Sequence, residues 1–318
     1  MNQPPNPQTP PTSALPGCWW HPTRQTGLTC VRCGRPACPD CLREASVGAQ
    51  CIDCVQAGRQ QAQTQQRQYR SSGLGARTVA GAKLSNSLVV TPTLIALNIV
   101  VYAYTAFQAK SFTDNQTAKL FGDWVLWPRA VAGESEWWRL FTSGFLHYGP
   151  IHLAVNMFSL WILGRDMEVL LGKVRFAAVY VLALIGGGVS VFLLDDSNRA
   201  TAGASGAIYG VLGGILVAVI RLRLNPAPAI GTIVLNLIIS VSIPGISLLG
   251  HLGGLVVGAL VTAAMVYAPT RNRAVWQSVA AVVVLVALVG LYFYRDSQLA
   301  GVTCQYLQGQ LVCSPPTG

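Results

Sequence analysis

From about residue 88 onward, the chain repeats apolar runs of nearly the length that a helix needs to cross a membrane. About 20 apolar residues in a helix span the roughly 30 Å of hydrocarbon in a bilayer. Only 11% of all residues are charged and 52% are hydrophobic, whereas soluble proteins average about 25% charged residues. We therefore predict an all-α polytopic membrane protein. Seven spans are predicted, at residues 90–108, 151–171, 176–194, 203–220, 228–243, 245–267 and 275–294.

The positive charges predict the orientation of these spans. If the N-terminus is cytoplasmic and all seven spans cross, 16 of the 22 Lys and Arg residues lie on the cytoplasmic side, as the positive-inside rule requires. This excess also accounts for the net charge of +10, so no nucleic-acid partner is expected. We expect a multi-pass plasma (inner) membrane protein with a cytoplasmic N-terminus and an extracytoplasmic C-terminus. The N-terminus has no apolar core, so no cleavable signal peptide is expected.

Composition divides the chain into five segments. The N-terminal residues are rich in Pro and poor in apolar groups, which favours disorder. A basic segment with many Gln residues precedes the spans and could lie against anionic lipid headgroups. The predicted segments are a disordered Pro-rich segment at 1–16, a cysteine-rich module at 17–55, a polar basic linker at 56–87, a membrane domain at 88–270, and a seventh transmembrane helix with an extracytoplasmic tail at 271–318.

The cysteine-rich module contains four ligand pairs of equal spacing. The pairs are Cys18 and His21, Cys30 and Cys33, Cys38 and Cys41, and Cys51 and Cys54. Eight soft ligands make two tetrahedral zinc sites, and a closed shell of four protein ligands is the structural type of site. Because so small a module has little apolar core, metal binding would supply most of its folding free energy. Unligated thiols are the alternative.

The order of these ligand pairs resembles B-box and RING-like cross-braced zinc fingers. The resemblance implies one Zn²⁺ ion held by Cys18, His21, Cys38 and Cys41 and a second held by Cys30, Cys33, Cys51 and Cys54. Sequential sites are the alternative pairing. Fingers of this type usually mediate protein contacts, so a protein partner is expected.

Two further cysteines, Cys304 and Cys313, lie in the C-terminal tail. The charge distribution places this tail outside the cytoplasm, where a disulfide can form. A Cys304–Cys313 disulfide is therefore predicted, with two free thiols as the alternative.

A serine and a histidine stand in glycine-rich runs inside the predicted spans, Ser205 in GASGAIYG and His251 in GHLGG. Titratable side chains are rare at membrane depth because removing them from water is costly, so an intramembrane histidine indicates a functional site. A serine hydroxyl becomes a useful nucleophile when a base takes its proton. The two residues therefore predict a catalytic Ser205–His251 pair.

Further polar residues are expected near this pair. His152 and Asn156 are four residues apart on the second predicted span and share one face of that helix. In the predicted topology they lie at the same membrane depth as Ser205 and His251, within roughly ten ångströms. Ser205 also falls in the first helical turn, where backbone amides lack acceptors. The Ser205 amide, His152 and Asn156 form a candidate oxyanion hole.

A structural explanation also exists for each of these residues. Ser205 belongs to a set of small residues whose spacing lets membrane helices approach closely. The glycines of this set include Gly210, Gly254 and Gly258. We expect both roles, because close packing would bring Ser205 to His251. His152 and Asn156 could instead be interfacial polar residues, and His147 is expected to be structural.

Three blocks, EWWRLFTSGFLHYGPIHLAVN, GASGAIYG and GHLGG, resemble the signature blocks of rhomboid intramembrane serine proteases over about residues 90–267. The resemblance implies a six-helix bundle plus one C-terminal transmembrane helix. It implies an endopeptidase that cleaves transmembrane segments of membrane proteins near the extracytoplasmic face, with no cofactor in catalysis. The implied site is a Ser205–His251 dyad without an acidic third member, with an oxyanion hole formed by His152, Asn156 and the Ser205 amide.

The resemblance also assigns residues around the dyad. Tyr209 would pack against the His251 ring, and Trp138 and Arg139 would belong to the loop between the first two spans. Gly250 stands where the family usually has alanine, a change between small residues. The alternative function is a catalytically inactive rhomboid-like protein that binds membrane clients, although such relatives typically lack the nucleophile or the base. A channel or transporter is disfavoured because the ionisable residues cluster near one face.

Overall fold

A computed structural model gives the architecture of the chain. It describes residues 15–45, 48–71, 77–83, 87–195, 199–243, 245–299, 303–307 and 310–314. The chain forms two compact units, Met1–Gly75 and Ala76–Gly318. The boundary lies within the linker that the sequence predicts at 56–87, so residues 77–83 belong to the membrane unit.

The first unit is small and is organised around its cysteines. It contains η1 (Pro39–Cys41), β1 (Leu42–Glu44), β2 (Ala49–Cys51) and α1 (Ile52–Ser71). Strands β1 and β2 pair antiparallel, with Leu42 opposite Cys51. The buried residues that pack together are Cys18, Ala37, Cys38 and Cys41. Helix α1 begins inside the module, since it contains Cys54, and it extends into the predicted linker.

The second unit is mostly helical. In chain order its elements are α2 (Val90–Ala109), η2 (Asn115–Thr117), α3 (Lys119–Trp124), α4 (Pro128–Gly133), α5 (Arg139–Thr142), η3 (Ser143–Phe145), α6 (Gly149–Leu171), α7 (Lys173–Leu194), α8 (Ser205–Arg221), α9 (Ala227–Ser242), α10 (Leu248–Tyr267), α11 (Arg273–Gln298), β3 (Thr303–Leu307) and β4 (Gln310–Ser314). All seven predicted spans are helices, at α2 and α6 to α11. The predicted fold class, a helical multi-pass membrane protein, is confirmed.

The seven helices differ in how well their length and hydropathy match those of a transmembrane span. Within the part of the chain that the structure describes, four are long and apolar enough to cross a membrane by length and composition alone, namely α2, α7, α10 and α11. Helices α8 and α9 are apolar but shorter. Helix α6 has 23 residues, and its sequence includes His152, Asn156 and Glu168. His152 and Asn156 belong to the candidate site, and Glu168 caps the start of α2.

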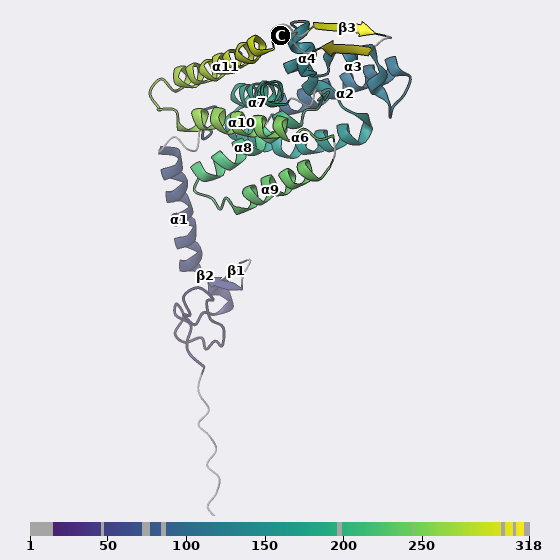
Figure 1. Cartoon of the computed structure of the whole chain (residues 1–318). Coiled ribbons are helices and arrows are strands. Elements are labelled where there is room, and N and C mark those ends of the chain that lie inside the picture. Colours follow the sequence, from purple (N-terminus) through teal and green to yellow (C-terminus); the bar gives the residue numbers. More distant parts are fainter. Residues whose placement is uncertain are drawn as a thin grey trace, which may run out of the picture. The chain divides into compact units, whose positions relative to one another are not determined.

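Helices α7, α8 and α10 form the centre of the bundle, with α9 and α11 on its outside (Figure 1). Glycines allow α8 and α10 to touch backbone to backbone. A Cβ atom on Gly254 would lie 1.9 Å from the carbonyl oxygen of Gly206, and one on Gly258 would lie 2.2 Å from that of Gly210. No side chain fits at such distances. The small residues therefore have the packing role that their spacing predicts.

A buried carboxylate joins α6 to the start of α2. One oxygen of Glu168 accepts hydrogen bonds from the backbone amides of Val89 and Val90 at 2.7 and 2.9 Å, and the other accepts from Thr91 at 2.8 Å. Three amides at a helix start have no acceptor within the helix, and a negative charge there is favourable. Glu168 thus fixes the beginning of the first span against the end of the second.

The segment between α2 and α6 is held by Arg139, which is 1% exposed. Its guanidinium donates to the Glu136 carboxylate at 2.5 Å and to the carbonyls of Gly122 and Val125 at 2.6 and 2.9 Å. Trp138, in contrast, is exposed. Arg139 therefore organises the loop between the first two spans.

The C-terminal tail contains a β-hairpin, which the sequence analysis did not predict. Strands β3 and β4 pair antiparallel with Cys304 directly opposite Cys313. The side chains of both strands lie outside what the structure describes, so the predicted disulfide remains a prediction.

Candidate active site and metal centres

Ser205 and His251 are brought together at the starts of two packed helices. Ser205 is the first residue of α8, and His251 is the fourth residue of α10. The distance from Ser205 Oγ to His251 Nε2 is 2.7 Å. His251 is 7% exposed. The glycine contacts between α8 and α10 are what allow two short-reaching groups, 46 residues apart in the chain, to form this hydrogen bond.

A second serine, Ser240 of α9, contacts the other nitrogen of the His251 ring. Ser240 Oγ lies 2.8 Å from His251 Nδ1 and 2.8 Å from the Tyr209 hydroxyl, and it donates to the Asn236 carbonyl at 2.8 Å. The sequence analysis missed Ser240. A serine in an apolar helix carries no distinctive signal, because many such hydroxyls only bond to the carbonyl four residues earlier.

The hydrogen bonds around His251 are consistent with one tautomer. When Nε2 accepts the Ser205 proton, the proton of the neutral ring is on Nδ1, and Nδ1–H donates to Ser240 Oγ. Ser240 can accept a second hydrogen bond from Tyr209 while donating its own proton to the Asn236 carbonyl. These hydrogen bonds then satisfy the donors and acceptors around His251, which is the condition for holding polar groups in a buried site.

The Tyr209 ring stacks on the His251 ring. The ring centroids are 4.0 Å apart and the interplanar angle is 13°. This contact agrees with the position that the family resemblance implies for Tyr209. Together with the Ser240 bond, the stacking leaves the imidazole little freedom to rotate.

His152 and Asn156, on α6, face the same site. His152 Nδ1 accepts a hydrogen bond from the Tyr148 amide at 3.2 Å, so the neutral ring carries its proton on Nε2. A Cβ atom added to Gly203 would lie 3.0 Å from His152 Nε2 and 3.6 Å from Ser205 Oγ. The Nε2–H group and the serine hydroxyl therefore flank the same glycine, whose φ of +134° also excludes larger residues.

The Asn156 amide is buried and has donor capacity to spare. Asn156 Nδ2 donates one hydrogen bond to the His152 carbonyl at 2.9 Å, and an amide nitrogen has two protons. Asn156 borders the same cavity as the dyad. The structure thus places Ser205, His251, His152, Asn156 and Tyr209, all of which the sequence singles out, around one cavity.

These groups open into one cavity of about 1030 Å³. Ser205, His251 and His152 line it, together with other polar side chains such as Thr232 and Asn236 and with apolar side chains from α6, α8 and α9. The apolar residues include Ile162, Leu212 and Ile239.

His147 lies outside the cavity lining. Its side chain is fully buried, and its ring centroid is 5.1 Å from that of His152. Neither ring nitrogen has a hydrogen-bond partner in the described part of the chain. This packing against His152 agrees with the structural role expected for His147.

The eight predicted metal ligands of the first unit gather in two groups. The groups are Cys18, His21, Cys38 and Cys41, and Cys30, Cys33, Cys51 and Cys54; within each, the ligand atoms lie within 4.8 Å of one another. His21 Nδ1 is 3.4 to 3.8 Å from three sulfurs of its group. Four ligands about 2.3 Å from a tetrahedral zinc are about 3.8 Å apart, so these spacings fit Zn²⁺. The grouping is the cross-braced one.

Two of the candidate metal ligands, Cys18 and Cys30, have a lowered thiol pKa. Burial opposes their ionisation, but hydrogen bonds from backbone N–H groups outweigh it and lower the pKa of Cys18 and of Cys30 to about 6. Metal ions bind the thiolate rather than the thiol. In contrast, burial raises the pKa of Cys41, and contact with Cys51 raises that of Cys54, each to about 12. Metal binding by both groups is therefore indicated by the type and the spacing of their ligands.

Comparison with known proteins agrees with this geometry. Residues 134–268 match the rhomboid domain family. The chain is 32% identical to rhomboid protease GluP of Bacillus subtilis (strain 168), over 69% of this chain and 43% of that protein. It is 25% identical to rhomboid protease AarA of Providencia stuartii, over 66% of this chain and 84% of that protein.

A plant relative is also similar. RHOMBOID-like protein 5 of Arabidopsis thaliana is 34% identical over 41% of this chain and 44% of its own length. The chain thus spans less than half the length of GluP and of this plant protein. Residues 134–268, which match the rhomboid domain family, contain Ser205, His251, His152 and Asn156. On its sequence blocks, its helical bundle and these relatives, this chain belongs to the rhomboid family.

Proposed function

We propose that the protein is an intramembrane serine endopeptidase that cleaves transmembrane segments of other membrane proteins. The observation that carries this proposal is the 2.7 Å contact between Ser205 Oγ and His251 Nε2, between two residues that line one cavity. A hydroxyl paired with a neutral imidazole is the arrangement of an activated nucleophile. The similarity to GluP and AarA, both named rhomboid proteases, supports the same reaction.

The acylation step uses both residues of the dyad. Ser205 Oγ adds to the scissile carbonyl carbon while its proton moves to His251 Nε2, and the carbonyl π electrons move to the oxygen. His251 then gives that proton to the leaving amine nitrogen as the C–N bond breaks. A water molecule attacks the resulting ester in the same way, with His251 as base, and restores the Ser205 hydroxyl.

The negative charge that develops on the carbonyl oxygen needs hydrogen-bond donors. The Ser205 amide is at the first turn of α8, where backbone N–H groups lack helical acceptors. His152 and Asn156 line the same cavity as the dyad, and each has a side-chain N–H group that can donate, His152 through Nε2 and Asn156 through its second Nδ2 proton. We assign these three groups to the oxyanion hole, whose donors act mainly in the transition state.

The distribution of basic residues supports the orientation of the enzyme. With the N-terminus in the cytoplasm, Ser205 and His251 lie near the extracytoplasmic ends of α8 and α10. Cleavage would then occur near that face of the plasma membrane. A cysteine-accessibility experiment that labels single cysteines in the loops from outside intact cells tests this orientation.

For the first unit we propose two structural Zn²⁺ ions and a role in protein contacts. With four protein ligands around each ion, no position is left for substrate, so zinc would fold the module rather than catalyse. The Trp19 side chain is 58% exposed, with the Arg35 guanidinium 4.5 Å from its ring centroid. An exposed tryptophan held by an arginine is suited to a protein interface.

A fluorophosphonate probe tests the catalytic proposal directly, because it reacts with activated serines. We expect labelling of the purified protein at Ser205, cleavage of a model transmembrane substrate, and loss of both in Ser205→Ala and in His251→Ala. Labelling and cleavage that persist in Ser205→Ala would exclude the serine mechanism. A folded wild-type protein that binds membrane proteins without labelling or cleaving would instead be the inactive client-binding relative.

A further inference from the structure

Three arginines of the membrane unit converge on one short turn, and we propose that they bind a phosphate group. The turn is residues 78–82, closed by the Thr78 amide on the Ala82 carbonyl at 2.8 Å. The arginines are Arg77, which precedes the turn, Arg175 in the first turn of α7, and Arg273 at the start of α11. This site is remote from the dyad, and the inference does not depend on the proposed protease activity.

Hydrogen bonds and close contacts fix the three side chains around the turn. Arg77 donates to the Gly81 carbonyl at 3.2 Å. A Cβ atom on Gly81 would lie 2.8 Å from Arg273 Nη1, so that guanidinium packs directly on the glycine. Arg175 donates to the Gln277 side chain at 2.7 Å, and Gln277 donates to the Ala80 carbonyl at 2.9 Å.

The partners of these arginines are all neutral. Among the residues that the structure describes, no carboxylate forms an ion pair with any of the three. Other arginines are paired with acids, namely Arg24, Arg35, Arg139 and Arg165. In addition, Arg273 Nε is buried and has no hydrogen-bond partner among the residues that the structure describes. A buried guanidinium N–H without an acceptor is costly, and a bound anion would satisfy it.

A fourth cation adds to the excess. Lys83 pairs with Arg77 across an isolated β-bridge, and like charges in directly opposed positions repel each other. The positive-inside rule requires basic residues on this side of the membrane, but it does not require that they gather around one five-residue turn. Guanidinium groups bind carboxylate and phosphate oxygens through two parallel hydrogen bonds, and the position of this site at a membrane interface favours phosphate.

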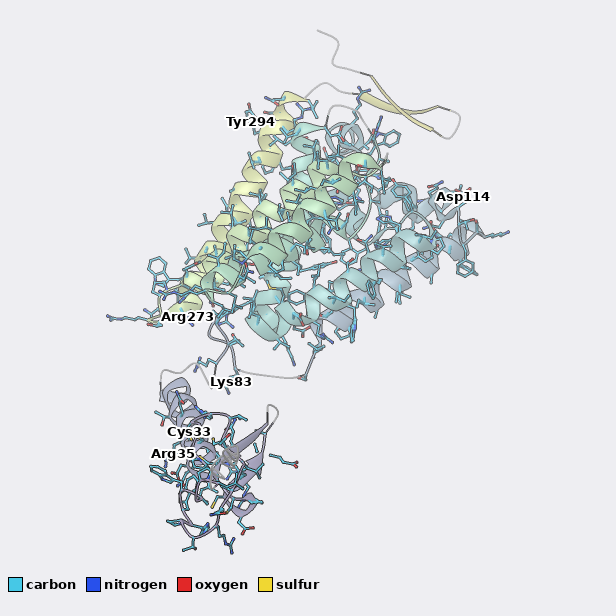
Figure 2. All side chains as sticks on the ribbon, turned by 90° about the horizontal axis from the view of Figure 1, so that it is seen from below. Cys33, Arg35, Lys83, Asp114, Arg273 and Tyr294 are labelled. Atoms are coloured by element: carbon cyan, nitrogen blue, oxygen red, sulfur yellow. The ribbon has the colours of Figure 1, made fainter. Side chains whose placement is uncertain are left out.

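The site lies where α7 and α11 begin, and both are candidate spans. Figure 2 shows Arg273 and Lys83 at one end of the helices, and Asp114 and Tyr294 at the other. Trp276, near the start of α11, is 55% exposed, and tryptophans are enriched at membrane interfaces. Basic pockets between transmembrane helices bind anionic lipid headgroups. The phosphate could therefore come from a lipid or from a soluble compound.

Bound phosphate would stabilise the bundle, because it would join α11 and residues 77–83 to α7. The test is the melting temperature of the full-length protein in detergent, followed by tryptophan fluorescence, with three additives: phosphatidylglycerol, phosphatidylcholine and inorganic phosphate. We expect a rise of about 3–6 °C at ten times the dissociation constant. A rise with phosphatidylglycerol alone identifies a lipid headgroup, and a rise with inorganic phosphate as well identifies free phosphate as a ligand.

Variants connect the effect to this site. The pair Arg175→Gln with Arg273→Gln should lose the rise, whereas the exposed pair Arg165→Gln with Arg223→Gln, which removes the same charge, should keep it. If the first pair fails to fold, Arg175→Lys with Arg273→Lys keeps the charge but not the planar geometry, and its rise should be smaller than that of the wild type. The proposal is overturned if no additive shifts the wild type, if phosphatidylcholine shifts it equally, or if these variants respond like the wild type.

Discussion

Replacing Ser240 by alanine should impair catalysis although Ser240 does not touch the substrate carbonyl. The substitution removes the acceptor of His251 Nδ1–H, and it also leaves the Tyr209 hydroxyl without this partner. His251 and Tyr209 are 7% and 5% exposed, so water cannot easily replace the lost bond. An unsatisfied buried donor costs about 1–3 kcal/mol.

This cost grows along the reaction, because His251 becomes positively charged and donates more strongly through Nδ1. If the whole of about 1–3 kcal/mol appears in the transition state, kcat/KM falls about 5- to 150-fold. The loss should be smaller than for the aspartate of a serine protease triad, where the change to asparagine lowers kcat about 10⁴-fold, since a hydroxyl is a neutral acceptor. Ser240→Thr keeps the hydroxyl and should retain most of the activity.

The assay is cleavage of a model transmembrane substrate, together with the rate of fluorophosphonate labelling, which reports activation of Ser205 without substrate docking. Ser242→Ala is the matched control: it lies on the same helix, is exposed, and donates only to the Ile238 carbonyl. The reasoning is wrong if Ser240→Ala labels and cleaves at the wild-type rate. It is equally wrong if Ser242→Ala loses as much activity.

Three further predictions follow from the packing and the donor set. Gly254→Ala should abolish folding or activity because its Cβ atom would lie 1.9 Å from the Gly206 carbonyl oxygen. Gly250→Ala should be tolerated, because the nearest atom to its Cβ atom would be 3.2 Å away. Thermal unfolding and cleavage assays separate the two variants. Asn156→Ala should lower turnover about 10- to 1000-fold at unchanged melting temperature, as loss of an oxyanion donor does elsewhere, and unchanged turnover on several substrates would make it an interfacial residue. Chelation of the metal should unfold the cysteine-rich module, as circular dichroism would show. A protein that lacks residues 1–75 should still cleave a substrate in detergent. If the truncated protein is folded but inactive, the module controls catalysis.

The truncation point illustrates how the structure changes an experiment. Composition places the end of the linker at residue 87, but Ala80 is fully buried and its carbonyl accepts from Gln277. Removing residues 1–80 would therefore cut into the membrane unit and expose the start of α11. Truncation after residue 75 follows the boundary between the two units.

The sequence by itself determined the properties that depend on local composition and spacing. Backbone groups in lipid need internal partners, so apolar runs of the right length had to be helices, and all seven are. Four ligand pairs of equal spacing indicated metal because soft ligands in that pattern have few other uses. Ser205 and His251 were recognisable because polar groups are costly in an apolar span.

Only the tertiary structure decided which groups surround the dyad and the termini of the spans. Ser240 meets His251, and Gln277 meets Ala80 across 197 residues, because helix packing sets the rotation of one helix against another. That rotation depends on many contacts at once, above all the glycine contacts of Gly254 and Gly258, and no local pattern encodes it. A serine in an apolar helix looks the same whether it bonds to its own backbone or orients a catalytic histidine, and only the neighbouring helix distinguishes the two.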